Sequence, residues 1–83
     1  MLSFTKYLAC YLGPKGIRVN SLSPSGVKTD MDKKFIENYT RNIPLGRMAQ
    51  KDEYNEAILF LVSDASKFMT GSNLIIDGGW TAW

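Results

Sequence analysis

The 83-residue sequence predicts an α/β fold built around a parallel pair of strands. Two short runs, at 17–22 and 74–76, have the composition of strands, and three longer segments repeat apolar residues at helical spacing. The predicted order is helix, strand, helix, helix, strand. Because a crossover through helices joins strands that run in the same direction, the pair is expected to be parallel with a right-handed connection.

The first helix is predicted over Met1–Leu12, where apolar residues fall on one stripe. Gly13-Pro14 ends it, because glycine accepts the left-handed conformation after a helix and proline cannot continue one. Ile17–Leu22 then alternates apolar and polar residues and contains β-branched side chains, as is typical of a strand. Ser23–Gly26 terminates this strand.

Two further helices are predicted, over Met31–Arg41 with Asp30 as its N-cap and over Lys51–Val62. Asp52 and Glu53 would lie in the first turn of the latter, where the helix dipole favours acidic side chains.

The second strand is predicted at Leu74–Ile76, a continuous apolar run of the kind that is buried on both faces of a sheet. Two parallel strands leave both sheet edges unpaired and cannot cover such a run. Part of the sheet is therefore expected to lie upstream.

Composition excludes several classes of function. The net charge is +2 and the ten basic residues are scattered, which predicts no nucleic-acid partner. The sequence has no histidine and a single cysteine, Cys10, so no metal site is predicted and Cys10 is expected to be a small core residue. No apolar run approaches the ~20 residues of a membrane span, and no signal peptide is recognisable. These features predict a cytoplasmic protein without a membrane partner.

One segment carries a family resemblance. Ile17-Arg18-Val19-Asn20 is followed by Pro24-Ser25-Gly26-Val27-Lys28-Thr29, and this resembles the short-chain dehydrogenase/reductase family, in which I-R-V-N precedes P-G-x-[VI]-x-T. Further fragments resemble that family's C-terminal signature in the same order: Pro44-Leu45-Gly46-Arg47, Leu61–Ser66, Thr70-Gly71 and Asp77-Gly78-Gly79. The resemblance covers essentially the whole chain.

The resemblance implies that residues 1–83 are the C-terminal part of a single doubly wound parallel (Rossmann) domain that binds NAD or NADP. By carry-over, the cofactor-binding residues are Pro24, Gly26, Val27 and Thr29. Pro24 would shape the turn, the backbone of Val27 would bond the nicotinamide carboxamide, and Thr29 would contact the carboxamide or the pyrophosphate. The sequence departs from the family pattern at Ser25, where glycine usually follows the proline.

The family's catalytic groups are a tyrosine, a lysine four residues later and a serine, and a glycine-rich turn holds its pyrophosphate. Neither the glycine-rich motif nor a credible catalytic pair occurs in the sequence. Tyr11 and Lys15 have the spacing, but Gly13-Pro14 breaks the helix between them. No catalytic residue is therefore predicted, and Met1 is expected to fall a few residues after the missing lysine.

The resemblance implies the C-terminal segment of an oxidoreductase that interconverts an alcohol and a carbonyl on a small-molecule substrate, inactive and without detectable NAD(P)H binding as this chain alone. The alternative is a non-catalytic oligomerisation or interaction module. Homo-oligomer contacts are expected through Lys51–Val62 and through the C-terminal strand and tail, Leu74–Trp83, although the tail could equally fold back on its own core.

The segments Pro44–Met48 and Gly78–Trp83 resemble members associated with bacterial surface-sugar or flagellin-glycan pathways, but acyl-carrier-protein ketoreductases and sugar dehydrogenases share the same motifs. Substrate and the choice between NAD and NADP stay open.

Overall fold

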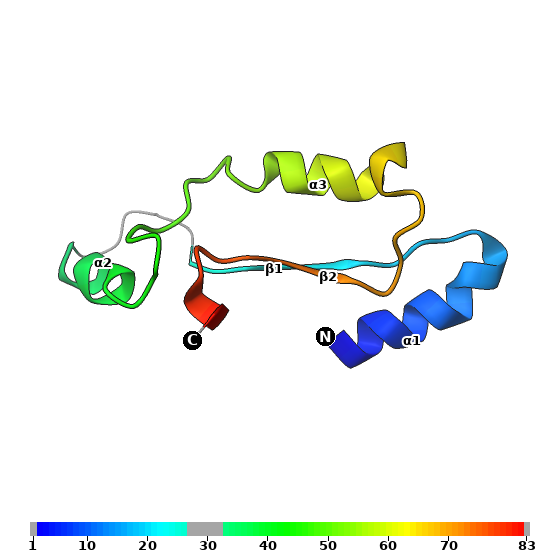
Figure 1. Ribbon diagram of the computed structural model, residues 1–83, viewed down its shortest axis with the longest axis horizontal. Coiled ribbons are helices and arrows are strands. Elements are labelled where there is room, and N and C mark those ends of the chain that lie inside the picture. The colour runs from blue at the N-terminus through cyan, green and yellow to red at the C-terminus, as the bar shows by residue number, and fades with distance from the viewer. Residues whose placement is uncertain (1, 27–32, 83) are drawn as a thin grey trace. The chain divides into compact units, whose positions relative to one another are not determined.

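The computed structural model describes residues 2–26 and 33–82, and its elements form an α/β arrangement around two strands (Figure 1). The strands are neighbours in one sheet and run in the same direction, so the prediction of a parallel α/β fold is confirmed. In chain order, the helices and strands are α1 (Leu2–Leu12), β1 (Ser21–Pro24), α2 (Lys33–Thr40), α3 (Asn55–Val62) and β2 (Asn73–Ile76), with 3₁₀ turns at Gly13–Lys15, Asp64–Ser66 and Trp80–Ala82.

The described residues divide into two compact units. The first contains residues up to Ser23 together with Asn55–Ile75, and hence α1, α3 and most of both strands. Within it, α1 and α3 lie on opposite sides of the strand pair (Figure 1). The second contains Pro24–Tyr54 and Ile76–Trp83, and hence α2, the ends of both strands and the C-terminal turn.

The end of α1 follows the predicted signal. The helix stops at Leu12, and Gly13–Lys15 adds one 3₁₀ turn with Pro14 in its first positions. Gly16 closes this turn at a φ of 77°, and its N–H donates to the Gly13 carbonyl at 2.9 Å. A left-handed residue costs glycine little, which explains why the chain reverses here.

The first strand begins four residues later than predicted. Residues 17–20 meet a loop instead of a neighbouring strand: the Val19 N–H donates to Thr70 Oγ1 at 3.0 Å and its carbonyl accepts from the Gly71 N–H at 2.7 Å. Strand pairing starts where the Ser21 N–H donates to the Ser72 carbonyl at 2.9 Å. The alternating pattern therefore identified an extended segment correctly but not which part of it pairs.

Polar side chains reinforce the pairing of the strands. The hydroxyls of Ser21 and Ser23, on one face of β1, both donate to Asn73 Oδ1, at 2.9 Å and 2.8 Å. Side chains two residues apart share one face of a strand, which is why a single amide oxygen reaches both hydroxyls.

The helix α3 begins four residues later than predicted, at Asn55. The prediction that Asp52 and Glu53 form its first turn is wrong, since only Glu56 is acidic there. Glu53 is held in a preceding turn, where its carboxylate accepts the Gln50 N–H at 2.9 Å. A side chain that satisfies a backbone donor offers that segment an alternative to helical hydrogen bonding.

Helix α2 is compared with the prediction only over its described part. Its described part runs from Lys33 to Thr40, and the predicted start at Met31 and the cap at Asp30 lie outside the described residues. Arg41 follows in a turn, with its N–H donating to the Glu37 carbonyl at 3.2 Å.

Little of the apolar surface is covered. The buried apolar residues among those described are Ala9, Ile43, Met48 and Tyr54. Ile75 in β2 is 53% exposed, against the expectation of burial on both faces, and Cys10 is exposed, so its assignment to the core is wrong. The physical reason is the same for both: two strands and three short helices supply too few elements to cover both faces of a sheet.

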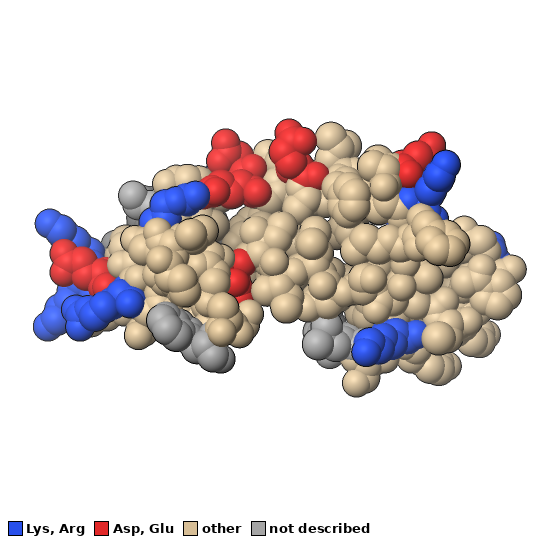
Figure 2. All heavy atoms as spheres, viewed as in Figure 1, with Lys and Arg blue, Asp and Glu red and all other residues tan. Residues whose placement is uncertain are grey.

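The face in Figure 2 shows charged side chains in small groups separated by neutral surface. Within the described part of the chain, no helix is long and apolar enough to cross a membrane.

Candidate functional site

The predicted cofactor loop starts at the carboxyl end of β1, where Pro24 is the last strand residue and is exposed. Ser25 and Gly26 follow and are half-buried. The carboxyl ends of parallel strands are where doubly wound sheets bind their ligands. Of the four predicted contacts, Pro24 and Gly26 lie at this edge, whereas Val27 and Thr29 lie outside the described residues.

Gly26 is enclosed by side chains. A Cβ at this position would lie 2.9 Å from Met48 Cε and 2.9 Å from Tyr39 Oη. Its backbone is engaged on both sides, because the N–H donates to Tyr39 Oη at 2.9 Å and the carbonyl accepts from the Ala49 N–H at 3.4 Å. Glycine is needed here for space, since Gly26 is not among the glycines with positive φ.

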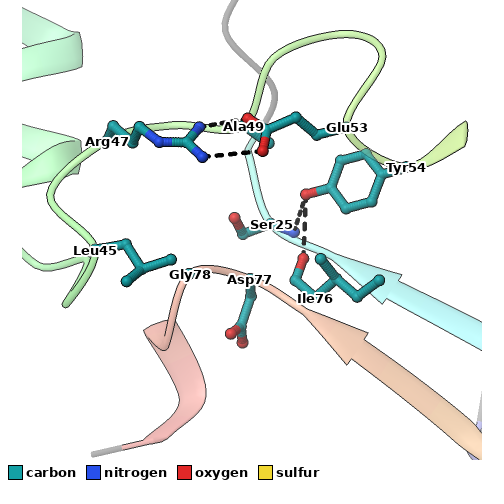
Figure 3. A pocket seen from close by; sticks show the side chains of 9 residues that line it. All are labelled: Ser25, Leu45, Arg47, Ala49, Glu53, Tyr54, Ile76, Asp77 and Gly78. Atoms are coloured by element: carbon teal, nitrogen blue, oxygen red, sulfur yellow. Dashed lines mark hydrogen bonds and ion pairs between the residues drawn. The ribbon is translucent and has the colours of Figure 1, made fainter. Parts of the chain in front are cut away.

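Tyr54 joins the ends of the two strands. Its side chain is buried at 8% exposure, and its hydroxyl accepts the Ser25 N–H at 3.3 Å and donates to the Ile76 carbonyl at 3.1 Å (Figure 3). Both backbone groups lie at the carboxyl ends of the strands. Ser25, which stands where the family usually has glycine, is thus fixed through its backbone N–H.

These groups enclose a cavity of about 80 Å³ (Figure 3). Pockets that bind drug-sized ligands are ~300–1,000 Å³, so this one is far too small for a dinucleotide. The cavity lies beside Ser25 at the start of the predicted cofactor loop. The residues that line it are Ser25, Leu45, Arg47, Ala49, Glu53, Tyr54, Ile76, Asp77 and Gly78.

An ion pair borders this cavity. The guanidinium of Arg47 binds both carboxylate oxygens of Glu53, with Nη2 at 2.9 Å from Oε2 and Nη1 paired with Oε1 (Figure 3). The hydrogen bonds from Arg47, together with the Gln50 N–H, lower the pKa of Glu53 to about 2. The same carboxylate raises the pKa of Arg47 above its usual value. Both groups are therefore charged across the ordinary pH range.

The Asp77-Gly78-Gly79 sequence is explained by close packing. A Cβ on Gly78 would lie 2.8 Å from Ile43 Cγ2, and one on Gly79 would lie 2.7 Å from Pro44 Cγ. Both glycines have positive φ, 66° and 97°, so a side chain there would meet both backbone strain and a clash. The Gly78 carbonyl accepts the Leu45 N–H at 3.0 Å. The two family-like fragments at 44–47 and 77–79 are thus two sides of one contact.

The Ile17-Arg18-Val19-Asn20 motif has a structural role in the first unit. The Arg18 guanidinium donates to carbonyl groups at the end of α3, namely Leu61 at 3.3 Å and Ser63 at 3.2 Å, and to the Ser66 carbonyl at 2.9 Å. A cation at a helix C-terminus is favoured by the helix dipole. Asn20 bonds the following loop in both directions, donating to the Met69 carbonyl and accepting the Ser72 N–H, each at 3.0 Å.

The Tyr11/Lys15 spacing does not form a catalytic pair. Lys15 Nζ lies over the Tyr11 ring, 5.3 Å from its centroid, in a cation–π contact. The two residues also belong to different helical segments, because α1 ends at Leu12. Within the described residues, no group of three or more His, Cys, Asp or Glu side chains could hold a metal ion.

Sequence reasoning missed the side chains that support the loop. The sequence assigns no role to Tyr39 or Tyr54, and places Arg18 only within a motif. The available signal is chemical: a tyrosine carries a hydroxyl that needs a partner when it is buried, unlike phenylalanine.

Comparisons with known proteins agree with these features. A family model described as enoyl-(acyl carrier protein) reductase matches residues 1–81. The chain is 54% identical over 78 residues to a trans-4-hydroxycyclohexanecarboxylate dehydrogenase of Sinomonas cyclohexanicum, covering 94% of this chain and 30% of that protein.

Solved structures give the same assignment. A short-chain dehydrogenase from Leptospira borgpetersenii with bound NAD+ matches with a TM-score of 0.92 and 48% identity, over 96% of this chain and 32% of its own. A 4-hydroxyisoleucine dehydrogenase complexed with NADH matches with a TM-score of 0.87 and 36% identity, over 99% of this chain and 35% of its own. The chain thus spans about a third of the length of each of these three proteins. On its sequence, its parallel α/β fold and these matches, the chain belongs to the short-chain dehydrogenase/reductase family.

Proposed function

We propose that this chain is the C-terminal part of an NAD(P)-dependent oxidoreductase that interconverts an alcohol and a carbonyl, and that it is inactive alone. The observation that carries the proposal is the match itself: 54% identity to a dehydrogenase, extending over 94% of this chain but only 30% of the relative. The catalytic tyrosine and lysine of the family would come from a segment preceding Met1. The proposal includes a cytoplasmic location, where nicotinamide dinucleotides are available.

The role proposed for this chain is to form the nicotinamide side of the site. When bound, the dinucleotide supplies the hydride acceptor or donor. Pro24 ends the strand at the edge of the sheet and Gly26 is enclosed by its neighbours. Val27 and Thr29 are the proposed contacts of the nicotinamide end. The fit rests on position, since this loop follows the carboxyl end of a parallel strand.

The upstream reading frame tests the proposal. Extending it by about a dozen codons should reveal Tyr-x-x-x-Lys, the spacing that places both side chains on one helix face. A stop codon in that stretch would overturn the proposal. The longer protein should oxidise a secondary alcohol with NAD+ or NADP+, and trans-4-hydroxycyclohexanecarboxylate is a first compound to assay because the 54% identical relative is named for it.

We also propose that the full protein self-associates through the segment Lys51–Val62 and the C-terminal strand and tail. The support is the exposed apolar surface on α3, where Leu59 is 60% and Val62 is 72% exposed. Contiguous exposed apolar surface is typical of interfaces.

A further inference from the structure

Three aromatic side chains stack in the second unit. Phe35 and Tyr39, one helical turn apart on α2, have ring centroids 6.1 Å apart. Trp80, in the C-terminal turn, stacks on Tyr39 with centroids 4.9 Å apart and an interplanar angle of 16°. Trp80 thus packs against its own chain, with 37% of its surface still exposed.

Tyr39 makes two different contacts at once. Its ring packs against Trp80, and its hydroxyl accepts the N–H of Gly26 at 2.9 Å. The hydroxyl and ring carbon also fill the space beside Gly26, at 2.9 Å and 3.0 Å from the place of a Cβ. A displacement of the Tyr39 ring would therefore free the Gly26 amide and open the space beside it.

Trp80 is itself held by Asp77. One carboxylate oxygen of Asp77 accepts the Gly79 N–H at 2.9 Å, and the other accepts the Thr81 N–H at 3.1 Å and the Thr81 hydroxyl at 2.7 Å. These bonds close the turn that contains Trp80 on both sides. The backbone on both sides of Trp80 is thus fixed by hydrogen bonds to Asp77.

We propose that Tyr39 and Trp80 are positioning residues for Gly26, one of the proposed cofactor-binding residues: the C-terminal turn holds the Tyr39 ring, and the Tyr39 hydroxyl fixes the Gly26 backbone. This inference rests on the proposed function. It assigns the C-terminal turn a role in dinucleotide affinity, although none of its residues needs to touch the dinucleotide.

The test uses the full-length protein with four variants. Tyr39→Phe keeps the ring stack and removes the hydroxyl, Trp80→Ala removes the stack, and Trp80→Phe keeps an aromatic partner. Tyr7→Phe is the matched control, since Tyr7 is an exposed tyrosine that also stacks on a neighbouring ring. The measurements are the amide proton shift of Gly26 by ¹⁵N NMR, the Kd of NADH and NADPH by fluorescence titration, and the melting temperature.

We expect Tyr39→Phe and Trp80→Ala to shift the Gly26 amide and to weaken dinucleotide binding about two- to tenfold, the range for one lost hydrogen bond. Trp80→Phe and Tyr7→Phe should leave both unchanged. A purely structural role would lower the melting temperature of Tyr39→Phe without changing its Kd, and that result would overturn the inference while the proposed function stands. A wild-type protein that binds neither dinucleotide would instead refute the proposed function, and the coupling with it.

Discussion

At the scale of single residues, two tyrosines of the site satisfy backbone groups at and just after the ends of the strands. Tyr54 and Tyr39 each use a hydroxyl for this purpose, at Ser25 and Gly26. Such contacts bridge positions 29 and 13 residues apart, so periodicity along the sequence carries no trace of them. The location of Pro24 and Gly26 could be predicted, but their supports could not.

Gly26→Ala should destabilise the full-length protein by about 1–3 kcal/mol, the cost of forcing a methyl group into filled space. The added Cβ would meet Met48 and Tyr39 at 2.9 Å. Gly13→Ala is the matched control, because nothing lies within 4 Å of a Cβ there and its φ is not positive. Urea unfolding gives the free energy of unfolding of both variants. Equal losses of stability would show that the space around position 26 does not require glycine.

In the full-length protein, Arg18→Met should lower the free energy of unfolding by about 2–3 kcal/mol, because it removes a charged donor from several carbonyl groups at once while keeping most of the apolar stem. Arg41→Met is the control, since Arg41 makes one exposed side-chain bond, to Asn38 Oδ1 at 3.1 Å. Urea midpoints compare them. A loss for Arg18→Met no larger than that of the control would mean that the bonds to the end of α3 are not stabilising.

At the scale of elements, the sequence predicted the presence of each helix and strand better than its ends. Both β1 and α3 begin four residues after the predicted starts. Before β1, the Val19 N–H bonds the side chain of Thr70, which is 51 residues away, so no local pattern could show it. Before α3, Arg47 and the Gln50 N–H hold Glu53 in a turn, and hydrophobic periodicity does not register such polar contacts.

The turn before α3 should respond to acid. The folded pKa of Glu53 is about 2, against 4.5 without its partners. Because the folded pKa is the lower one, the stabilisation is fully present above pH 4.5 and is lost as the pH falls from 4.5 through about 2. A ¹³C titration of the Glu53 carboxyl should give the low value, and Arg47→Met should return it toward 4.5. Glu56→Gln serves as the control, and a Glu53 midpoint unaffected by Arg47→Met would refute the ion pair as the cause.

Helix α3 carries the proposed subunit contact. Val62→Lys places a charge on a residue that is 72% exposed in this chain, so it should disrupt an interface formed there. Sedimentation velocity of the full-length protein should then show smaller species than the wild type. Ala65→Lys adds the same charge three residues later on an exposed position. If both variants sediment like the wild type, α3 is not the contact.

At the scale of the whole molecule, residues 2–26 and 33–82 form helices and strands but bury few apolar side chains. Phe68 is fully exposed and Ile75 half exposed, in agreement with the short list of buried apolar residues. The upstream strands that we propose would cover this run, which accounts for a pattern at 74–76 that is typical of a fully buried strand. The same reasoning accounts for the error at Cys10.

The isolated chain should therefore melt without a cooperative transition and bind the dye ANS, while retaining far-UV helical signal. NADH fluorescence should show no saturable binding. The full-length protein under the same conditions is the control and should unfold cooperatively. A sharp melt and a defined oligomer of the 83-residue chain would instead favour an independent interaction module.

The Arg18 network also bears on how relatives of this protein are counted in genomes. Since Ile17-Arg18-Val19-Asn20 ties a strand entry to the end of α3, its value to the protein does not depend on turnover. A homologous protein without the catalytic tyrosine and lysine would still need the hydrogen bonds of this motif for its fold. The presence of this motif in a gene therefore indicates the fold and not the activity. The tyrosine–lysine pair has to be found separately before the gene product is assigned as an enzyme.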